Sequence, residues 1–157
     1  MTRRITFKLN GETRSVEVEP SDILLDVLRE KLGVKSPKIG CERGDCGACT
    51  VLLDGKSVRT CLILAIEVDR CQITTVEGLG GAGLTPLQEA FLERGSFQCG
   101  FCAPGIVLSA TELLGKNPHP SEAEVKEAIA GNLCRCTGYQ PIIDAVLAVS
   151  SKPGRRA

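Results

Sequence analysis

The chain has 157 residues, and its 19 basic and 19 acidic side chains give a formal net charge of zero. Its hydrophobic fraction of 43% is enough for one ordinary domain or two small ones, although only 3% of the residues are aromatic. The balanced charge provides no basic face, which argues against a nucleic acid partner. No apolar run is long enough to span a bilayer, so no membrane span is expected.

The first half of the sequence predicts a mixture of strands and one helix. Apolar and polar side chains alternate over residues 5–18 around the turn letters NGE, which predicts a β-hairpin. Residues 20–33 predict a helix that Ser21 caps and Gly33 ends. A second hairpin is expected over residues 50–60, turning at the letters DG, and a last short strand over residues 72–78.

The second half predicts four helices. The glycine-rich segment GLGGAG indicates a boundary, so we expect domains at residues 1–77 and 85–151, a linker at 78–84 and a tail at 152–157. Capping signals mark the helix starts: Thr85 with Pro86 and Gln88, Pro104, and Ser121 with Glu124, before a last helix in QPIIDAVLAVS. A close cysteine pair falls in the loop of each helix pair, which predicts a pseudo-twofold bundle with a ligand between the loops.

Nine cysteines require an explanation. Arg3 and Arg4 have no apolar stretch behind them, so we do not expect a twin-arginine export signal, and we expect the chain to stay in the cytoplasm. Stable disulfides are disfavoured in that reducing compartment. Close cysteine spacings there indicate metal ligands first.

Four cysteines of the first half follow one pattern. Cys41, Cys46 and Cys49 have the spacing C-x4-C-x2-C, and Cys61 follows further along the chain. This is the plant-type [2Fe–2S] pattern, with three ligands from one loop. The loop's glycines allow it to wrap tightly with backbone N–H groups toward the sulfurs: Gly40, Gly44 and Gly47. A zinc site would instead favour paired C-x2-C knuckles.

Four cysteines of the second half form two close pairs, Cys99 with Cys102 and Cys134 with Cys136. Residues i and i+2 point to different faces of a helix, so the second pair must lie on a turn between helices to ligate together. By themselves these four thiols leave zinc open. Next to a plant-type site, a second iron–sulfur cluster is the better interpretation.

The remaining chemistry-bearing residues predict little. Cys71 is expected to be a buried, small apolar side chain. His119, in the letters NPHP, is the one histidine and is expected to be exposed and without a role. The basic tail, Lys152, Arg155 and Arg156, is expected to be a frayed terminus.

The motifs GCERGDCGACTVLLDG, SVRTCL, QCGFCAPG and GNLCRCTGY together resemble the iron–sulfur subunit of the xanthine oxidase family of molybdenum hydroxylases. The resemblance covers about residues 3–150. It implies an α+β chain, with an N-terminal β-grasp [2Fe–2S] ferredoxin-like domain followed by an all-α, pseudo-twofold four-helix bundle that binds a second [2Fe–2S] cluster.

The resemblance also implies partners and an electron route. Electrons would run from molybdopterin in a large subunit to the cluster of Cys99, Cys102, Cys134 and Cys136, then to the cluster of Cys41, Cys46, Cys49 and Cys61. They would leave to FAD in a medium subunit, or to a haem subunit, and the complex could be a dimer of heterotrimers. Gln98 matches the glutamine that bonds the pterin, its alternative being a turn-capping polar residue, and Cys136 matches the cysteine closest to the pterin.

Two other functions stay open at this point. A stand-alone two-cluster ferredoxin would shuttle electrons between separate enzymes and purify alone. A zinc-stabilised interaction module would be colourless. No Ser/His/Asp set is available with one histidine, and no phosphate-binding loop pattern is present. The resemblance implies that the substrate site lies on another chain.

Overall fold

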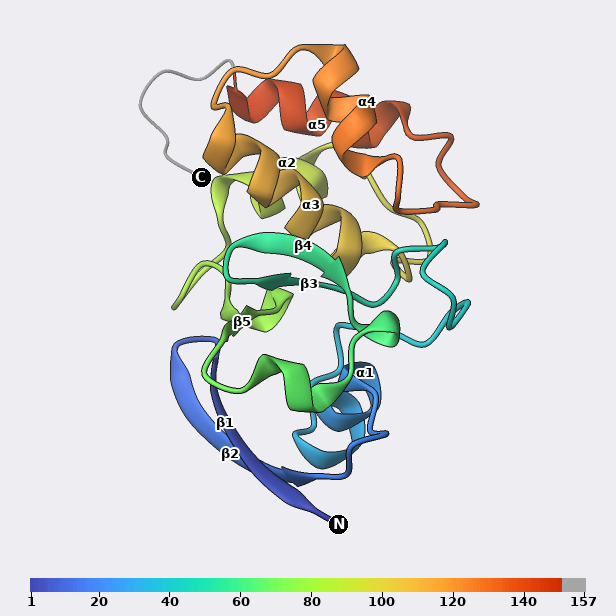
Figure 1. Cartoon of the computed structure of the whole chain (residues 1–157). Helices are drawn as coiled ribbons and strands as arrows, with labels where there is room; N and C mark the ends of the chain where they lie inside the picture. The colour runs from blue at the N-terminus through green and yellow to red at the C-terminus, as the bar shows by residue number, and fades with distance from the viewer. Residues whose placement is uncertain (151–157) are drawn as a thin grey trace.

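The computed structural model describes residues 1–150, so the basic tail at 152–157 and the last residue of the segment 85–151 lie outside the described residues. The chain is a mixed α/β fold with a five-stranded sheet in the order β2-β1-β5-β3-β4. Helices α2 to α5 stack above the sheet in Figure 1, and α1 lies against its lower part. None of the described helices is long and apolar enough to cross a membrane.

The two predicted hairpins are both present. In chain order the strands are β1 (Arg3–Leu9), β2 (Glu12–Val18), β3 (Thr50–Leu53), β4 (Lys56–Arg59) and β5 (Gln72–Thr74). Strands β1 and β2 pair antiparallel, as do β3 and β4. Each turn needs two consecutive positive φ angles, which Asn10-Gly11 and Asp54-Gly55 supply. The predicted strand at 72–78 is shorter, because Val76–Gly78 turns into a 3-10 helix.

Strand β5 joins the two hairpins into one sheet. It pairs parallel with β1, where Lys8 lies opposite Gln72, and antiparallel with β3, where Leu53 lies opposite Ile73. Asn10 reinforces this junction, because its side chain accepts the N–H of Thr75 at 2.8 Å and donates to the Thr75 hydroxyl at 3.0 Å.

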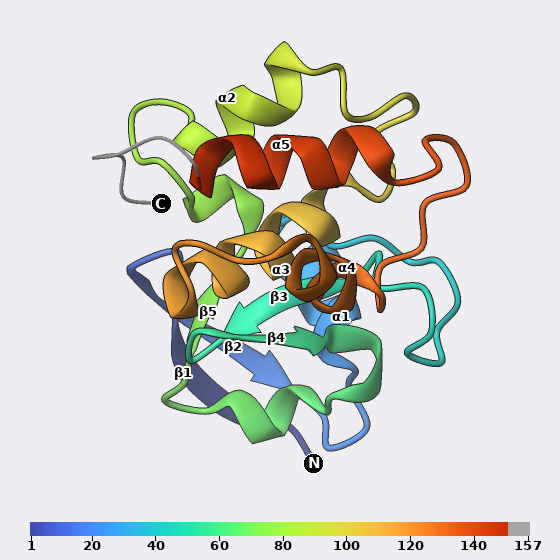
Figure 2. The ribbon, with the colours of Figure 1, turned by 90° about the horizontal axis from the view of Figure 1, so that it is seen from above.

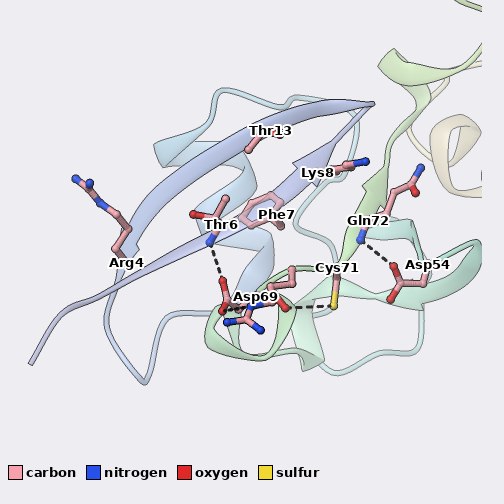
Figure 3. A pocket seen from close by; sticks show the side chains of 10 residues that line it. Arg4, Thr6, Phe7, Lys8, Thr13, Asp54, Asp69, Cys71 and Gln72 are labelled. Atoms are coloured by element: carbon pink, nitrogen blue, oxygen red, sulfur yellow. Dashed lines mark hydrogen bonds and ion pairs between the residues drawn. The ribbon is translucent and has the colours of Figure 1, made fainter.

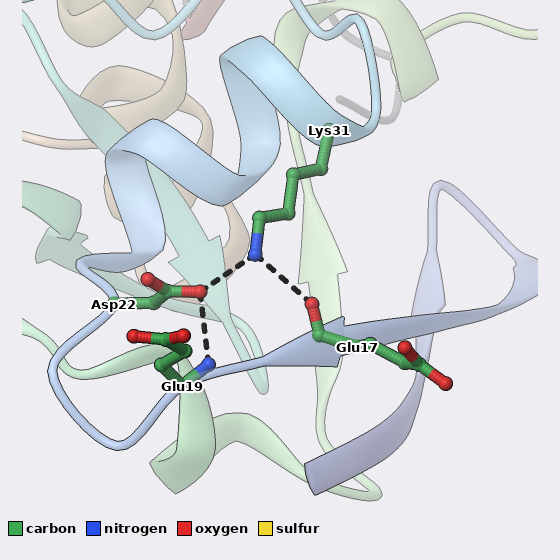
Figure 4. A network of polar contacts seen from close by, with 4 residues as sticks. All are labelled: Glu17, Glu19, Asp22 and Lys31. Atoms are coloured by element: carbon green, nitrogen blue, oxygen red, sulfur yellow. Dashed lines mark hydrogen bonds and ion pairs between the residues drawn. The ribbon is translucent and has the colours of Figure 1, made fainter. Parts of the chain in front are cut away.

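The predicted first helix is correct in place but wrong in its cap. It consists of α1 (Leu24–Asp26) followed by one π-helical turn (Val27–Lys31), and Ser21 caps neither. The N–H of Leu24 instead donates to the carbonyl oxygen of Ile63 from a distant segment. Asp22 takes the local role, accepting from the N–H of Glu19 and from Lys31 (Figure 4), and the ion pair with Lys31 lowers the pKa of Asp22.

The four helices of the second half are α2 (Pro86–Glu93), α3 (Ala103–Lys116), α4 (Glu122–Ile129) and α5 (Gln140–Ser150). The capping boxes predicted for Thr85 with Gln88 and Ser121 with Glu124 are confirmed. Pro104 lies in the first turn of α3 as predicted. Further 3-10 helices cover Thr60–Leu62 and Ala65–Val68 in the first half.

Two apolar cores stabilise the two halves of the chain. One lies between the sheet and α1, around Ile5, Phe7 and Leu28, and the other lies among α2 to α5, around Ile106 and Ile142. Figure 2 shows α5 and α2 on the side of the helical layer away from the sheet, with α3 beneath them. Among the described residues, helix α3 packs on β3 and β4 and makes the main contact between the helices and the sheet.

Candidate metal centres

The cysteine-bearing loops from both halves of the chain lie on one side of the molecule. The loop at 36–49, drawn in cyan, the loop between α2 and α3, drawn in yellow, and the loop between α4 and α5, drawn in orange, share one side in both views (Figures 1 and 2). These three loops carry seven of the nine cysteines, and an eighth, Cys61 in the 3-10 helix Thr60–Leu62, packs with Cys49.

The first site comprises Cys41, Cys46, Cys49 and Cys61. Cys49 and Cys61 are buried and pack with Leu25 of α1, whereas Cys41 and Cys46 are half-buried. The side chains approach as two pairs. The backbone N–H of Cys46 donates to the Cys41 sulfur at 3.4 Å, and the Cys61 thiol interacts with that of Cys49.

The backbone of this loop favours an anionic sulfur at its outer pair. The N–H groups of Arg43 and Cys46 lower the pKa of the Cys41 thiol to about 6. Burial raises the pKa of Cys61 to about 11, and the neighbouring Cys49 adds to this effect. Metal ligation requires thiolates, so this site combines one sulfur that ionises readily with one whose buried charge a metal must compensate.

The loop glycines permit this close wrapping. A Cβ at Gly40 would approach the Cys46 sulfur to 2.8 Å, and a Cβ at Gly44 would collide with the side chain of Leu62. The φ angle of Gly44 is +85°, which L side chains rarely adopt. These positions therefore explain on steric grounds why the motif carries glycine.

The second site comprises Cys99, Cys102, Cys134 and Cys136, from the two loops of the helical half. Cys102 is buried and Cys134 half-buried, whereas Cys99 and Cys136 are exposed. These cysteines also form an inner and an outer pair, because Cys102 interacts with Cys134, and the sulfurs of Cys99 and Cys136 lie 3.6 Å apart. As predicted, Cys134 and Cys136 lie on a turn between helices.

Hydrogen bonds also divide the second site electrostatically. Burial raises the pKa of Cys102 to about 12, and the neighbouring Cys134 adds to it. Burial acts in the same direction on Cys134, but hydrogen bonds from the Thr137 hydroxyl and nearby backbone N–H groups lower its pKa overall. In the outer pair, the backbone N–H of Phe101 and then Cys136 lower the pKa of Cys99, and the hydrogen bond with Cys99 raises that of Cys136.

The pairwise arrangement of the cysteines bears on which metal group fits. A tetrahedral zinc site brings four ligands around one ion. Within residues 1–150, no three Cys, His, Asp or Glu side chains come together in a way that would hold a single metal ion. A [2Fe–2S] cluster instead takes four cysteines, two on each iron, and each site offers one inner and one outer pair. The residues present therefore fit two [2Fe–2S] clusters.

A buried polar residue, Asn132, joins the two sites. It is 1% exposed, donates to the Gly47 carbonyl oxygen and to the Thr50 hydroxyl, each at 3.1 Å, and accepts from the Ser109 hydroxyl at 2.8 Å. These bonds connect α3, β3 and the first cysteine loop to a residue two positions before Cys134. Asn132 is not among the residues predicted from the sequence, although a polar residue in the motif GNLC offered a signal.

One backbone bond and one side-chain bond reinforce this junction. The N–H of Leu133 donates to the Cys46 carbonyl oxygen at 2.8 Å, and the Arg59 guanidinium donates to the Gly131 carbonyl oxygen at 2.7 Å. A Cβ at Gly47 would collide with the Gly131 carbonyl oxygen. The ligand loops of the two sites are therefore in direct contact, and at Gly47 there is no room for a side chain.

Tyr139 organises the second site from within. Its hydroxyl accepts the N–H of Cys134 at 2.8 Å and donates to the Asn132 carbonyl oxygen at 3.1 Å. Gln98 spans the same site on the outside, because its amide donates to the Cys136 carbonyl oxygen at 3.1 Å and its side chain is exposed. Gln98 thus connects the two loops that carry the outer cysteines.

The remaining candidates lie apart from these sites. Cys71 is half-buried against the sheet core, where burial and then Asp54 raise its pKa, and it lines a shallow surface pocket with Thr6 and Asp69 (Figure 3). It is thus less buried than predicted. His119 is exposed as predicted, and its Nδ1 lies 2.8 Å from the Ser150 carbonyl oxygen at the end of α5.

Two family models match the chain. A 2Fe-2S iron-sulfur cluster binding domain matches residues 7–75, and a [2Fe-2S] binding domain matches residues 75–147. The first match contains Cys41, Cys46, Cys49 and Cys61, and the second contains the four cysteines of the second site. The chain therefore carries two [2Fe–2S]-binding domains in series.

Individual relatives cover nearly the whole chain. The nicotine 6-hydroxylase small subunit of Paenarthrobacter nicotinovorans is 50% identical over 97% of this chain and 92% of its own length. The nicotinate dehydrogenase small FeS subunit of Eubacterium barkeri is 51% identical over 90% of this chain and 91% of its own length. A chain in the crystal structure of quinoline 2-oxidoreductase from Pseudomonas putida 86 superposes with a TM-score of 0.92 at 48% identity, covering 95% of this chain and 93% of that one.

Proposed function

Because the chain belongs to the iron–sulfur small subunits of the molybdenum hydroxylases, the xanthine oxidase family, we propose that it carries electrons between the other subunits of such an enzyme. Electrons arrive from a molybdopterin site on a large subunit and leave to FAD on a medium subunit, or to a haem subunit. One observation carries the proposal: two complete four-cysteine sites whose ligand loops are directly hydrogen-bonded through Leu133 and Asn132.

The cysteines of each site hold one [2Fe–2S] cluster. Cys41, Cys46, Cys49 and Cys61 hold one, and Cys99, Cys102, Cys134 and Cys136 hold the other. When bound, each cluster supplies a centre that accepts and donates single electrons. The chain's own contribution is to bury the inner cysteines, to direct N–H groups toward the sulfurs, and to fix the separation of the two sites.

The proposal also includes the class and the bounds of the two domains. The sheet with α1 is a β-grasp ferredoxin-like domain over residues 1–77, and α2 to α5 form a pseudo-twofold four-helix bundle over residues 85–151, joined by the linker at 78–84. The packing of α2 against α5 and of α3 against α4 supports this division, as do the two separate apolar cores.

The surface around the cysteines favours a subunit over a free shuttle. Ile39, Phe101 and Leu133 are 45%, 46% and 57% exposed, and each lies in a cysteine-bearing segment. Exposed apolar side chains around a redox site indicate a surface that a partner covers. The stand-alone two-cluster ferredoxin is the alternative, and it would need a polar surface at these positions. None of the nine cysteines forms a disulfide, which suits a reducing cytoplasm.

Within the complex, Gln98 and Cys136 mark the side that faces the molybdopterin subunit. Both are exposed, and the Gln98 amide donates to the Cys136 carbonyl oxygen. Gln98 therefore stands where it can also bond a cofactor of the partner, and Cys136 is the ligand at which electrons arrive. The assembly of such subunits into a dimer of heterotrimers completes the proposal.

Co-purification tests the proposal. A tagged copy of the chain, expressed in its native host from its own locus, should retain larger chains that contain molybdenum and FAD or haem. A monodisperse chain that carries both clusters and no partner would contradict the subunit role and support the shuttle.

Gln98→Ala tests the pterin side. In the purified complex, both clusters should assemble, and their reduction by the enzyme's substrate should be slower than in the wild type. Gln140→Ala is the matched control, because Gln140 is also exposed and its amide bonds only Asp144 within the part of the chain described here. Unchanged reduction kinetics in Gln98→Ala would remove the pterin role.

A further inference from the structure

Lys38 belongs to the loop of the first site, but its charge lies beside the second. Its ammonium group lies 5.5 Å from the centroid of the Phe101 ring. Phe101 stands between Cys99 and Cys102 in the motif QCGFC. A cation over the face of an aromatic ring is attracted by the ring's electrons, so this stacking holds the charge against the second site's loop.

The backbone around Lys38 is fixed from several directions. Its N–H donates to the Ala48 carbonyl oxygen at 2.9 Å, and its ammonium donates to the Ser36 carbonyl oxygen at 3.3 Å. Arg29 donates to the Pro37 carbonyl oxygen at 2.7 Å, and Glu77 accepts the N–H of Ser36 at 2.9 Å. The position of the ammonium group is therefore built into the fold.

Burial and the charged groups that face Lys38 shift its pKa in opposite directions. Burial has the largest effect and lowers the pKa of Lys38, as does the charge of Arg29. Glu77 raises that pKa, and so do the sulfurs of Cys102 and Cys99. Cysteines of the second site are thus among the groups that interact electrostatically with this lysine, although it belongs to the other half of the chain.

The second site has a different cation of its own, Arg135, between Cys134 and Cys136. Arg135 is exposed, so water and salt screen its charge, whereas Lys38 is half-buried and screened less. Between Cys41 and Cys46 of the first site, Glu42, Arg43 and Asp45 leave one net negative charge. The charge of Lys38 therefore adds to a difference between the two sites.

We propose that Lys38 raises the reduction potential of the cluster held by Cys99, Cys102, Cys134 and Cys136. Gaining one electron makes that cluster more negative, and a fixed neighbouring cation stabilises the more negative state. Lys38 thereby links the two halves electrostatically, since a residue of the first loop sets the driving force at the second site. This inference rests on the proposed function, because it requires a cluster at the second site.

The test is a redox titration of the purified complex, with the two cluster signals followed separately by low-temperature electron paramagnetic resonance (EPR). Lys38→Gln should make reduction of the second cluster about tenfold less favourable, which is about 59 mV for a one-electron couple. Lys38→Arg should restore most of the wild-type potential, because it keeps the charge. Lys35→Gln is the matched control, since Lys35 is an exposed lysine of the same loop, and it should leave both potentials unchanged.

Three outcomes would overturn parts of this account, and they are distinguishable. Two normal cluster signals with an unchanged second potential in Lys38→Gln would refute the role of Lys38 alone. An equal shift in Lys38→Arg would show that packing and not charge is responsible, which also refutes it. Absence of a second cluster signal in the wild-type complex would refute the proposed function, and the inference would fail with it.

Discussion

The two cysteine sites perform the same kind of ligation with different architecture. In the first, one loop supplies three of the four ligands, and α1 covers its inner pair through Leu25. In the second, two loops that four helices hold together supply two ligands each, and the outer pair, Cys99 and Cys136, is exposed. The first site therefore depends mainly on local backbone geometry, and the second on tertiary packing.

Under the proposed function, this difference suits the two sites to distinct tasks. An exposed outer pair places the second site at the surface, where a partner's cofactor would approach Cys136. The outer pair of the first site, Cys41 and Cys46, is half-buried, so this site is less exposed to solvent. The direct bonds from Asn132 and Leu133 to the first loop then fix the distance between sites that otherwise fold on separate cores.

The largest expected effect comes from removing one ligand. Cys136→Ser should abolish the signal of the second cluster and leave that of the first intact, because the sites share no ligand. Cys49→Ser should do the reverse. EPR of the reduced protein measures both, and loss of both signals in either variant would show that the sites do not assemble independently.

A smaller effect is expected where the loops touch. Gly47→Ala should destabilise the chain by about 3 kcal/mol, since φ is +72° and the new Cβ would collide with the Gly131 carbonyl oxygen. Gly100→Ala is the control, with a φ of +76° and no atom within 4 Å of the new Cβ, and should cost about 1 kcal/mol. Equal losses in denaturation experiments would mean that the loops do not touch at Gly47.

Asn132→Ala should lower the free energy of unfolding by about 2 kcal/mol. The buried hydroxyls of Ser109 and Thr50 would each lose their hydrogen bond to the Asn132 side-chain amide. The substitution should also change the magnetic coupling between the two reduced clusters, which depends on their separation. The exposed Gln140→Ala should change neither quantity. A loss of stability with unaltered coupling would limit Asn132 to a packing role.

The smallest effect is expected for Tyr139→Phe, which keeps the ring and removes the hydroxyl between Cys134 and Asn132. We expect a loss of about 1 kcal/mol in the free energy of unfolding. The EPR signal of the second cluster should shift while that of the first does not. A shift in the EPR signal of the first cluster, with that of the second unchanged, would contradict the assignment of Tyr139 to the second site.

The features predicted correctly from the sequence are turns and helix starts, which depend on residues close together in the chain. Asn10-Gly11 and Asp54-Gly55 determine their hairpins, and Thr85 and Ser121 start their helices, because turns and caps are local interactions. The cap at Ser21 was wrong because a distant carbonyl, that of Ile63, satisfies the N–H of Leu24.

Contacts between segments far apart in the chain could not be predicted from the sequence. The parallel pairing of β1 with β5 was not predictable, since no local signal specifies it. The eight cysteines were identified by spacing, but their inner and outer pairing, and the roles of Asn132, Arg59 and Lys38, depend on contacts between segments far apart in the chain.

The presence of two clusters is tested by low-temperature EPR of the dithionite-reduced protein, titrated against potential, with iron and acid-labile sulfide measured on the same sample. Two distinct [2Fe–2S] signals are expected, with two irons and two sulfides for each cluster. A single signal, or zinc in place of iron at Cys99, Cys102, Cys134 and Cys136, would contradict this expectation.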